Sequence, residues 1–185
     1  AALAGCVSSK LPVDKGVESG DGGSAIYVAP DGQIINSGAE DAPLGSIHRA
    51  ANVADPGDTV VVQPGEYRET VEIEAGGEPE APITITGSSD AVLKAPADND
   101  GAVLQIDSNH IHLTGLTITG LLDSDAPDDP ASYHADKLIS LNGDVSDPED
   151  YLEGLVVSPN RLGNTGQSLI NSQQINNCDI GGFRG

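Results

Sequence analysis

The feature that most constrains this chain is a succession of short apolar clusters separated by loops of Gly, Asn, Asp and Pro. The clusters favour strands because they are rich in Val, Ile and Thr, and no long helical period follows residue 58. Short strands bury their apolar side chains and pair their backbones when each turn of the chain stacks on the previous one. The sequence therefore predicts an all-β solenoid, a parallel β-helix. The expected strands are residues 25–28, 59–62, 71–73, 83–86, 92–93, 103–106, 111–114, 116–119, 138–141, 155–157 and 175–180.

The spacing of similar clusters supports coils. Leu155 and Cys178 lie 23 residues apart, which is about the length of one solenoid repeat. Leu116 and Leu155 lie 39 residues apart, so one coil is expected to carry an insertion, and the acidic loop at 123–136 is the candidate. The alternative is an antiparallel sandwich, which predicts tight two-residue hairpins. Few segments have that signature, so the coil arrangement is favoured.

A short helix is predicted before the coils, at residues 44–54. Its apolar residues lie on one face at helical spacing, and Asp55-Pro56-Gly57 ends it because Pro56 restricts the preceding residue and Gly57 permits a turn. The apolar positions are Leu44, Ile47, Ala50, Ala51 and Ala54.

The charge excludes several classes of partner. The chain has 29 acidic and 8 basic residues, a net charge of −21, and no basic patch in its sequence. Binding to nucleic acid or to an anionic membrane surface is therefore disfavoured. The ordered apolar clusters also exclude a disordered acidic tail. Such a charge predicts a hydrated, salt-adapted surface of the haloarchaeal kind, because it repels itself at low salt. The alternative is an ordinary acidic secreted protein.

The N-terminal residues 3–6, Leu-Ala-Gly-Cys, resemble the lipobox of bacterial and archaeal lipoproteins. The resemblance implies that residues 1–6 are the remnant of a signal peptide and that Cys6 carries a lipid. Residues 7–24, rich in Ser, Gly, Asp and Lys, are then a flexible tether, and 25–185 form the β-helix domain. This predicts an extracellular protein anchored at the cell surface. The alternative is an ordinary tail that contains a cysteine.

Several segments resemble the N-terminal part of pectin-lyase-like right-handed β-helix proteins, which include alginate- and chondroitin-cleaving lyases. The resemblance covers residues 25–120 and implies a right-handed helix whose short N-terminal helix plugs one end and protects an open strand edge. It also implies that most catalytic coils lie beyond this stretch, so we expect the domain to be incomplete at its C-terminus. The segments are residues 26–32 (IYVAPDG), 42–50 (APLGSIHRA), 56–69 (PGDTVVVQPGEYRE) and 81–87 (APITITG).

This resemblance predicts a surface or secreted β-helix that acts on polysaccharide, with lyase-like action on an acidic glycan. A lyase neutralises the uronate carboxylate with a cation and removes the neighbouring proton with a base. The alternative is a non-catalytic surface β-helix that binds glycans or partners, or builds the cell envelope. In either case we expect a monomer, because a solenoid of this kind buries its core within one chain.

Few residues are candidates for the chemistry. His110 and His112 are two apart on an expected strand and so point to one side; Arg184 follows the last apolar cluster. The alternative for each is an ordinary outward side chain. An acidic cluster could bind Ca²⁺ through its oxygens, although it lacks the glycine and distal glutamate of an EF-hand and also suits a solvated loop. Its members are Asp123, Asp125, Asp128 and Asp129. A separate group of asparagines is expected to include members of a structural stack at a coil corner: Asn109, Asn171, Asn176 and Asn177.

Overall fold

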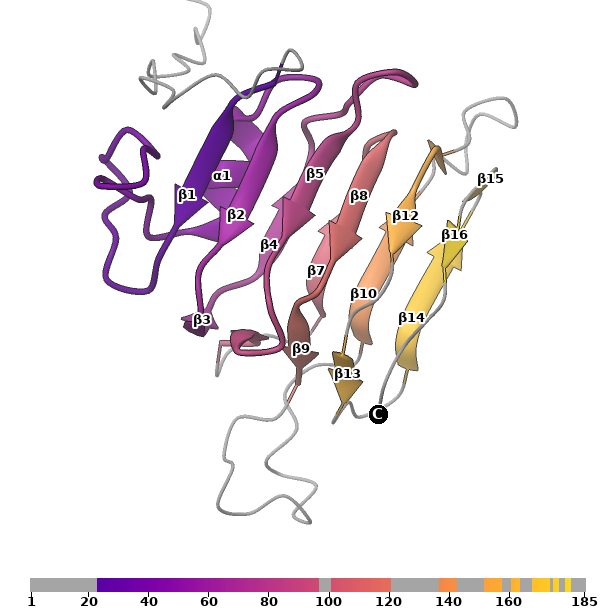
Figure 1. Ribbon diagram of the computed structural model, residues 1–185. Coiled ribbons are helices and arrows are strands. Elements are labelled where there is room, and N and C mark those ends of the chain that lie inside the picture. The colour runs from indigo at the N-terminus through magenta and orange to yellow at the C-terminus, as the bar shows by residue number, and fades with distance from the viewer. Residues whose placement is uncertain are drawn as a thin grey trace, which may run out of the picture.

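The computed structural model describes residues 23–96, 101–120, 137–142 and 152–157, together with the backbone of four short strands beyond them. Figure 1 shows the strands stacked side by side in successive coils. The strands are β1 (Ala25–Val28), β2 (Thr59–Val62), β3 (Gly65–Arg68), β4 (Val71–Ile73), β5 (Ile83–Thr86), β6 (Ala91–Lys94), β7 (Ala102–Ile106), β8 (Ile111–Thr114), β9 (Thr117–Thr119), β10 (Lys137–Asn142), β11 (Leu152–Glu153), β12 (Val156–Val157), β13 (Arg161–Gly163), β14 (Ser168–Gln173), β15 (Ile175–Asn176) and β16 (Asp179–Ile180).

The strands form three long sheets and one pair, and every pairing between named strands is parallel. The first sheet has the order β1-β2-β5-β8-β12-β16, the second β3-β6-β9-β13 and the third β4-β7-β10-β14, while β11 pairs with β15. Each full coil thus adds one strand to each sheet. The predicted parallel β-helix is confirmed.

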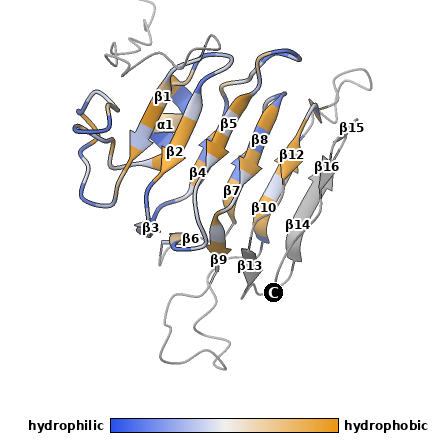
Figure 2. Cartoon of the chain, viewed as in Figure 1, coloured by the Kyte–Doolittle hydropathy of each residue, from blue (hydrophilic) through white to orange (hydrophobic). Residues whose placement is uncertain are grey.

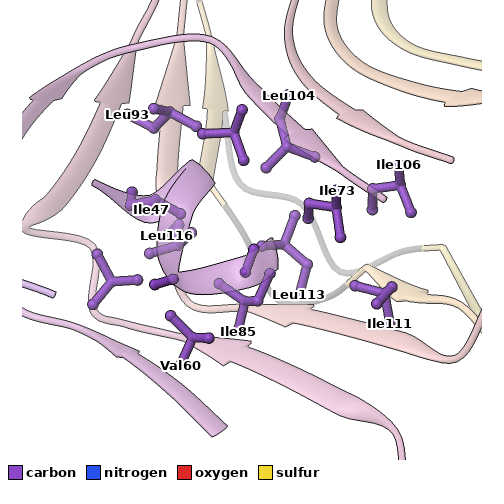
Figure 3. Packing of buried hydrophobic residues seen from close by; sticks show 14 of the residues in the cluster. Ile47, Val60, Ile73, Ile85, Leu93, Leu104, Ile106, Ile111, Leu113 and Leu116 are labelled. Carbon is purple, nitrogen blue, oxygen red and sulfur yellow. The ribbon is translucent and has the colours of Figure 1, made fainter. Parts of the chain in front are cut away.

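The core is a stack of aliphatic side chains inside the coils. In the first sheet Ile26, Val60, Ile85, Leu113 and Val157 are successive register neighbours. Each is buried, and the residues beside them in the strands are partly exposed. Figure 2 shows the resulting alternation of apolar and polar positions, and Figure 3 shows how several of these side chains pack. Short strands are thereby stabilised by their neighbours in adjacent coils.

The register corrects the predicted coil lengths. Val60, Ile85 and Leu113 are 25 and 28 residues apart, and the next neighbour, Val157, lies 44 residues after Leu113. The enlarged coil is therefore in the predicted place, since the chain from β9 to β10 runs through residues 120–136. It is longer than the predicted 39 residues because Leu155 follows the register of Ile111, not that of Leu116.

The capping helix α1 (Ile47–Val53) is shorter than the predicted 44–54. Leu44 is buried but forms an isolated parallel bridge with Val28, so it belongs to the sheet side of the turn. Ser46 is the N-cap and accepts a bond from the Arg49 N–H at 3.1 Å. The Glu69 carboxylate accepts from the Ile47 N–H at 2.7 Å and from the Ser46 hydroxyl at 2.6 Å, which satisfies groups that a helix start leaves open.

Helix α1 also occupies the free edge of the third sheet. Strand β4 is the last strand of that sheet and pairs only with β7. His48 Nδ1 accepts from the Glu72 N–H at 3.2 Å. The Asn52 amide donates to the Glu72 carbonyl at 2.6 Å and accepts from the Glu74 N–H at 2.9 Å. His48 and Asn52 lie on one helix face because they are four residues apart, so side chains take the place of a neighbouring strand, as the resemblance implied.

Tyr67 is the only aromatic residue among the described core residues, and its hydroxyl donates to the carbonyls of Gln63 at 2.8 Å and Val28 at 3.1 Å. Burial, and then the charges of Glu69 and Asp31, raise the pKa of Tyr67 from 10.0 to about 12. The stability that this shift contributes is complete below the unfolded pKa and is lost as the pH rises through the folded pKa.

We therefore expect the free energy of unfolding to fall between pH 10.0 and about 12 more steeply in the wild-type chain than in Tyr67→Phe. Denaturant titrations at several pH values across this window, with both proteins, measure the two slopes. The Tyr67→Phe protein is expected to be less stable at neutral pH, so the comparison uses the slopes and not the absolute values. Equal slopes would show that the Tyr67 hydroxyl does not titrate as described.

Candidate functional site

His110 lies in the turn before β8, and only His112 lies within that strand. The prediction that both are strand residues is therefore wrong for His110. Its φ is 55°, a left-handed conformation that it shares with Gly154, one coil further along, at 67°. The His110 N–H donates to the Glu153 carbonyl at 2.9 Å, and its Nε2 lies 3.9 Å from the Glu153 carboxylate. A Cβ on Gly154 would lie 2.0 Å from the His110 ring, so the ring packs against that glycine.

His112 lies on the outer side of the first sheet, between Thr84 and Val156 in the register. Partial burial, and then the charge of His110, lower the pKa of His112 below its ordinary value. A neutral imidazole can accept a proton. The register neighbours of His112 are a threonine and a valine, and neither can neutralise a substrate carboxylate. The two histidines therefore provide a base without the cation that lyase chemistry needs.

The predicted asparagine stack is correct in function for Asn109. Its Oδ1 accepts from the Glu153 N–H in the next coil at 2.9 Å, which ties the two coils together at a corner. Asn171 lies elsewhere, because its backbone is within β14, opposite Ser140 of β10. Asn176 lies in β15, opposite Glu153. Asn177 lies outside the described residues.

The most developed polar arrangement lies on the outer side of the third sheet, across two coils. It consists of Gln105, Asp107, Ser140 and Asn142, which we call the amide face. Asp107 accepts from the Gln105 amide at 2.7 Å and from the Asn142 amide at 2.9 Å. The Ser140 hydroxyl donates to Asn142 Oδ1 at 2.8 Å. One carboxylate thus joins amides from β7 and from β10.

A rigid layer supports the amide face. Gln105 and Ser140 are register neighbours, and the residues that alternate with the face are buried in the core. Two further polar residues, Asn171 and Gln173 of β14, are the register neighbours of Ser140 and Asn142. Amide, hydroxyl and carboxylate groups both donate and accept hydrogen bonds, so this face can pair with ligand hydroxyls. The buried alternating residues are Leu104, Ile106, Ile139 and Leu141.

The remaining predicted site residues lie outside the described part of the chain. They are Cys6, Asp123, Asp125, Asp128, Asp129 and Arg184. Within the described residues, no three His, Cys, Asp or Glu side chains are grouped so that they could hold a metal ion. In the same residues, no helix has both the length and the apolar character to cross a membrane.

The chain resembles known β-helix proteins. A family model described as "Pel9A-like, right handed beta helix region" matches residues 26–182. The chain is 30% identical over 106 residues to the uncharacterized protein YwoF of Bacillus subtilis, covering 54% of this chain and 23% of YwoF. It is 28% identical over 120 residues to the pectate lyase PEL9 of Emericella nidulans, covering 60% of this chain and 29% of that enzyme. It thus spans less than a third of either relative.

A solved structure supports the fold alone. The structure of the GH136 lacto-N-biosidase from Eubacterium ramulus superposes with a TM-score of 0.60 at 14% identity, covering 78% of this chain and 27% of that protein. At so low an identity the similarity concerns the arrangement of the coils and not the chemistry.

Proposed function

The chain belongs to the Pel9A-like right-handed β-helix family, and on that premise we propose that it forms part of a protein that binds and cleaves an acidic polysaccharide as a lyase. Two observations support this proposal. One relative is a pectate lyase, and the amide face offers donors and acceptors suited to sugar hydroxyls. The expected surface location, the lipid on Cys6 and the salt adaptation stay predictions from the sequence.

The observation that carries the proposal is the junction at Asp107. Its carboxylate accepts from Gln105 in its own coil and from Asn142 in the next, so the orientations of both amides are fixed before a ligand arrives. Neighbouring coils of a parallel sheet are about 4.8 Å apart. An extended polymer that crosses the strands would therefore meet a similar set of polar groups at each step.

The proposed reaction is a β-elimination. A base takes the proton from the carbon next to the uronate carboxylate, a double bond forms, the glycosidic C–O bond breaks, and the leaving oxygen takes up a proton. None of the four amide-face side chains is a base suited to that proton, so their proposed role is to bind and align the sugar. We propose that Ca²⁺ held by Asp123, Asp125, Asp128 and Asp129 screens the substrate carboxylate, since that stretch precedes β10 in the chain.

The test uses the full-length protein with pectate, alginate and chondroitin, with Ca²⁺ and at high salt, and measures the absorbance of the unsaturated product. Asn142→Ala is expected to lower kcat/KM on the cleaved polymer about tenfold, because it removes two hydrogen-bonding contacts of the amide face. A chelator is expected to lower the rate as well. Thr84→Ala, on the outer side of the first sheet, is the matched control and should leave the rate unchanged.

Two results would count against the proposal. The absence of product from every uronate polymer would reject the lyase assignment. If one of these polymers still bound and Asn142→Ala weakened that binding, the non-catalytic glycan-binding function would replace it. The amide face favours this second function specifically, because its four side chains can bind a sugar without cleaving it.

A further inference from the structure

The second sheet reverses the charge of the rest of the molecule. The described strands contain four basic residues, and three of them, Arg68, Lys94 and Arg161, belong to this one sheet. The only acidic residue in its strands is Glu66. In a chain of net charge −21, cations are scarce. Their collection on one sheet therefore calls for an explanation.

Arg68 and Lys94 are direct register neighbours on adjacent coils. Glu66 forms ion pairs with both of them: its Oε1 lies 2.7 Å from Arg68 Nη2, and its Oε2 contacts Lys94 Nζ. The hydrogen bond from Lys94 holds the pKa of Glu66 below its ordinary value, so the carboxylate is charged at neutral pH. One negative charge thus serves two positive ones, and a positive charge remains in excess.

Stability alone is a poor explanation for this arrangement. A single surface ion pair contributes about 0 to 1 kcal/mol, and it needs one cation, not two. Like charges placed directly opposite each other on neighbouring strands are destabilising. A ligand anion would remove that repulsion. Arg68 can receive one, because 47% of its side chain is exposed and its planar fork of N–H donors matches a carboxylate.

We propose that the outer face of the second sheet, centred on Arg68 and Lys94, binds a carboxylate of a uronate-containing polysaccharide. This contact is separate from the amide face, which lies on the third sheet. Arg161 extends it along the solenoid, because its backbone follows Thr117 in the register, two coils beyond Lys94's neighbour Glu66 in the strand order β3-β6-β9-β13. The sugar component rests on the proposed function; the need for an anion rests on the charges of the sheet.

The experiment measures binding of an oligogalacturonate to the full-length protein, beside its fully methyl-esterified form, which has the same sugars without the charge. Arg68→Gln and Lys94→Gln are each expected to weaken binding of the acidic form about fivefold and to leave the ester unaffected. Glu66→Gln should have the opposite effect and tighten binding, since it frees both cations. Lys15→Gln, in the predicted tether, changes the net charge equally and serves as the control. Thermal unfolding of each variant checks that it is folded.

The opposite signs separate a site from general electrostatics. Equal weakening by Arg68→Gln and Lys15→Gln, or no tightening by Glu66→Gln, would overturn the proposal. Equal competition by polyglutamate would reject the polysaccharide as ligand and favour an acidic protein. Loss of product formation by Asn142→Ala without any effect of the second-sheet variants would reject this inference and leave the proposed function intact. The expected pattern of signs without any cleavage would do the reverse.

Discussion

Replacing Gly115 by alanine is expected to destabilise the solenoid by about 3 kcal/mol, because two costs combine at that position. Gly115 has a φ of +81°, which side chains rarely adopt, and an added Cβ would lie 2.3 Å from the Gly87 carbonyl oxygen in the preceding coil. The corner between β8 and β9 therefore has no room for a methyl group. Equilibrium unfolding in denaturant, followed by β-type circular dichroism, measures the loss.

Gly57→Ala is the matched control for this prediction. Gly57 also has a positive φ, +90°, but the nearest atom to an added Cβ is 3.6 Å away. It should therefore cost only the conformational strain, about 1 kcal/mol. If the two variants were equally stable, the close approach of the coils at Gly87 would not contribute, and the corner would be looser than described.

Ile85→Ala is expected to cost about 2 to 5 kcal/mol, the range for large-to-small changes in a packed core. Ile85 is fully buried between its register neighbours Val60 and Leu113 (Figure 3), so the cavity would interrupt the stack in the middle of the described coils. Because each coil is stabilised by its neighbours, the loss should affect both sides of the cavity. Denaturant unfolding provides the free energy, and hydrogen exchange locates the affected strands.

Thr84→Ala, one position earlier in β5, is the control because Thr84 is only partly buried. Its effect should stay within about 0.5 kcal/mol. A comparable loss at both positions would mean that the two sides of β5 do not differ in burial as the alternation predicts.

The sequence predicted the first sheet well and the second sheet poorly. Strands β2, β5 and β8 each have two inward aliphatic positions, so their alternation is visible. Strand β3 has a single buried residue, Tyr67, between Glu66 and Arg68, and resembles a polar loop in one dimension. Strand β13 is equally short in apolar residues. Pairing with β6 and β9 makes these segments strands, and such pairing depends on residues in other coils.

The candidate site was not predicted, because its residues are ordinary polar ones from distant parts of the sequence. Asp107 and Asn142 are 35 positions apart and meet only through the register of β7 and β10. A local signal did exist: Leu-Gln-Ile-Asp at 104–107 and Ile-Ser-Leu-Asn at 139–142 share one alternation. The histidines stood out by residue type instead, and the turn that separates His110 from the strand could not be inferred from their spacing.

The filled strand edges at the N-terminal end have a consequence for self-association. The Tyr27 N–H donates to the Gly38 carbonyl at 2.7 Å and the Leu44 N–H donates to the Tyr27 carbonyl at 2.9 Å, so a loop of the chain occupies β1 much as helix α1 occupies β4. A strand from a second molecule would have to displace these bonds before it could pair there. The stack therefore has a polarity for growth: coils can be added in the direction of β16, while amyloid-like extension from β1 and β4 is obstructed.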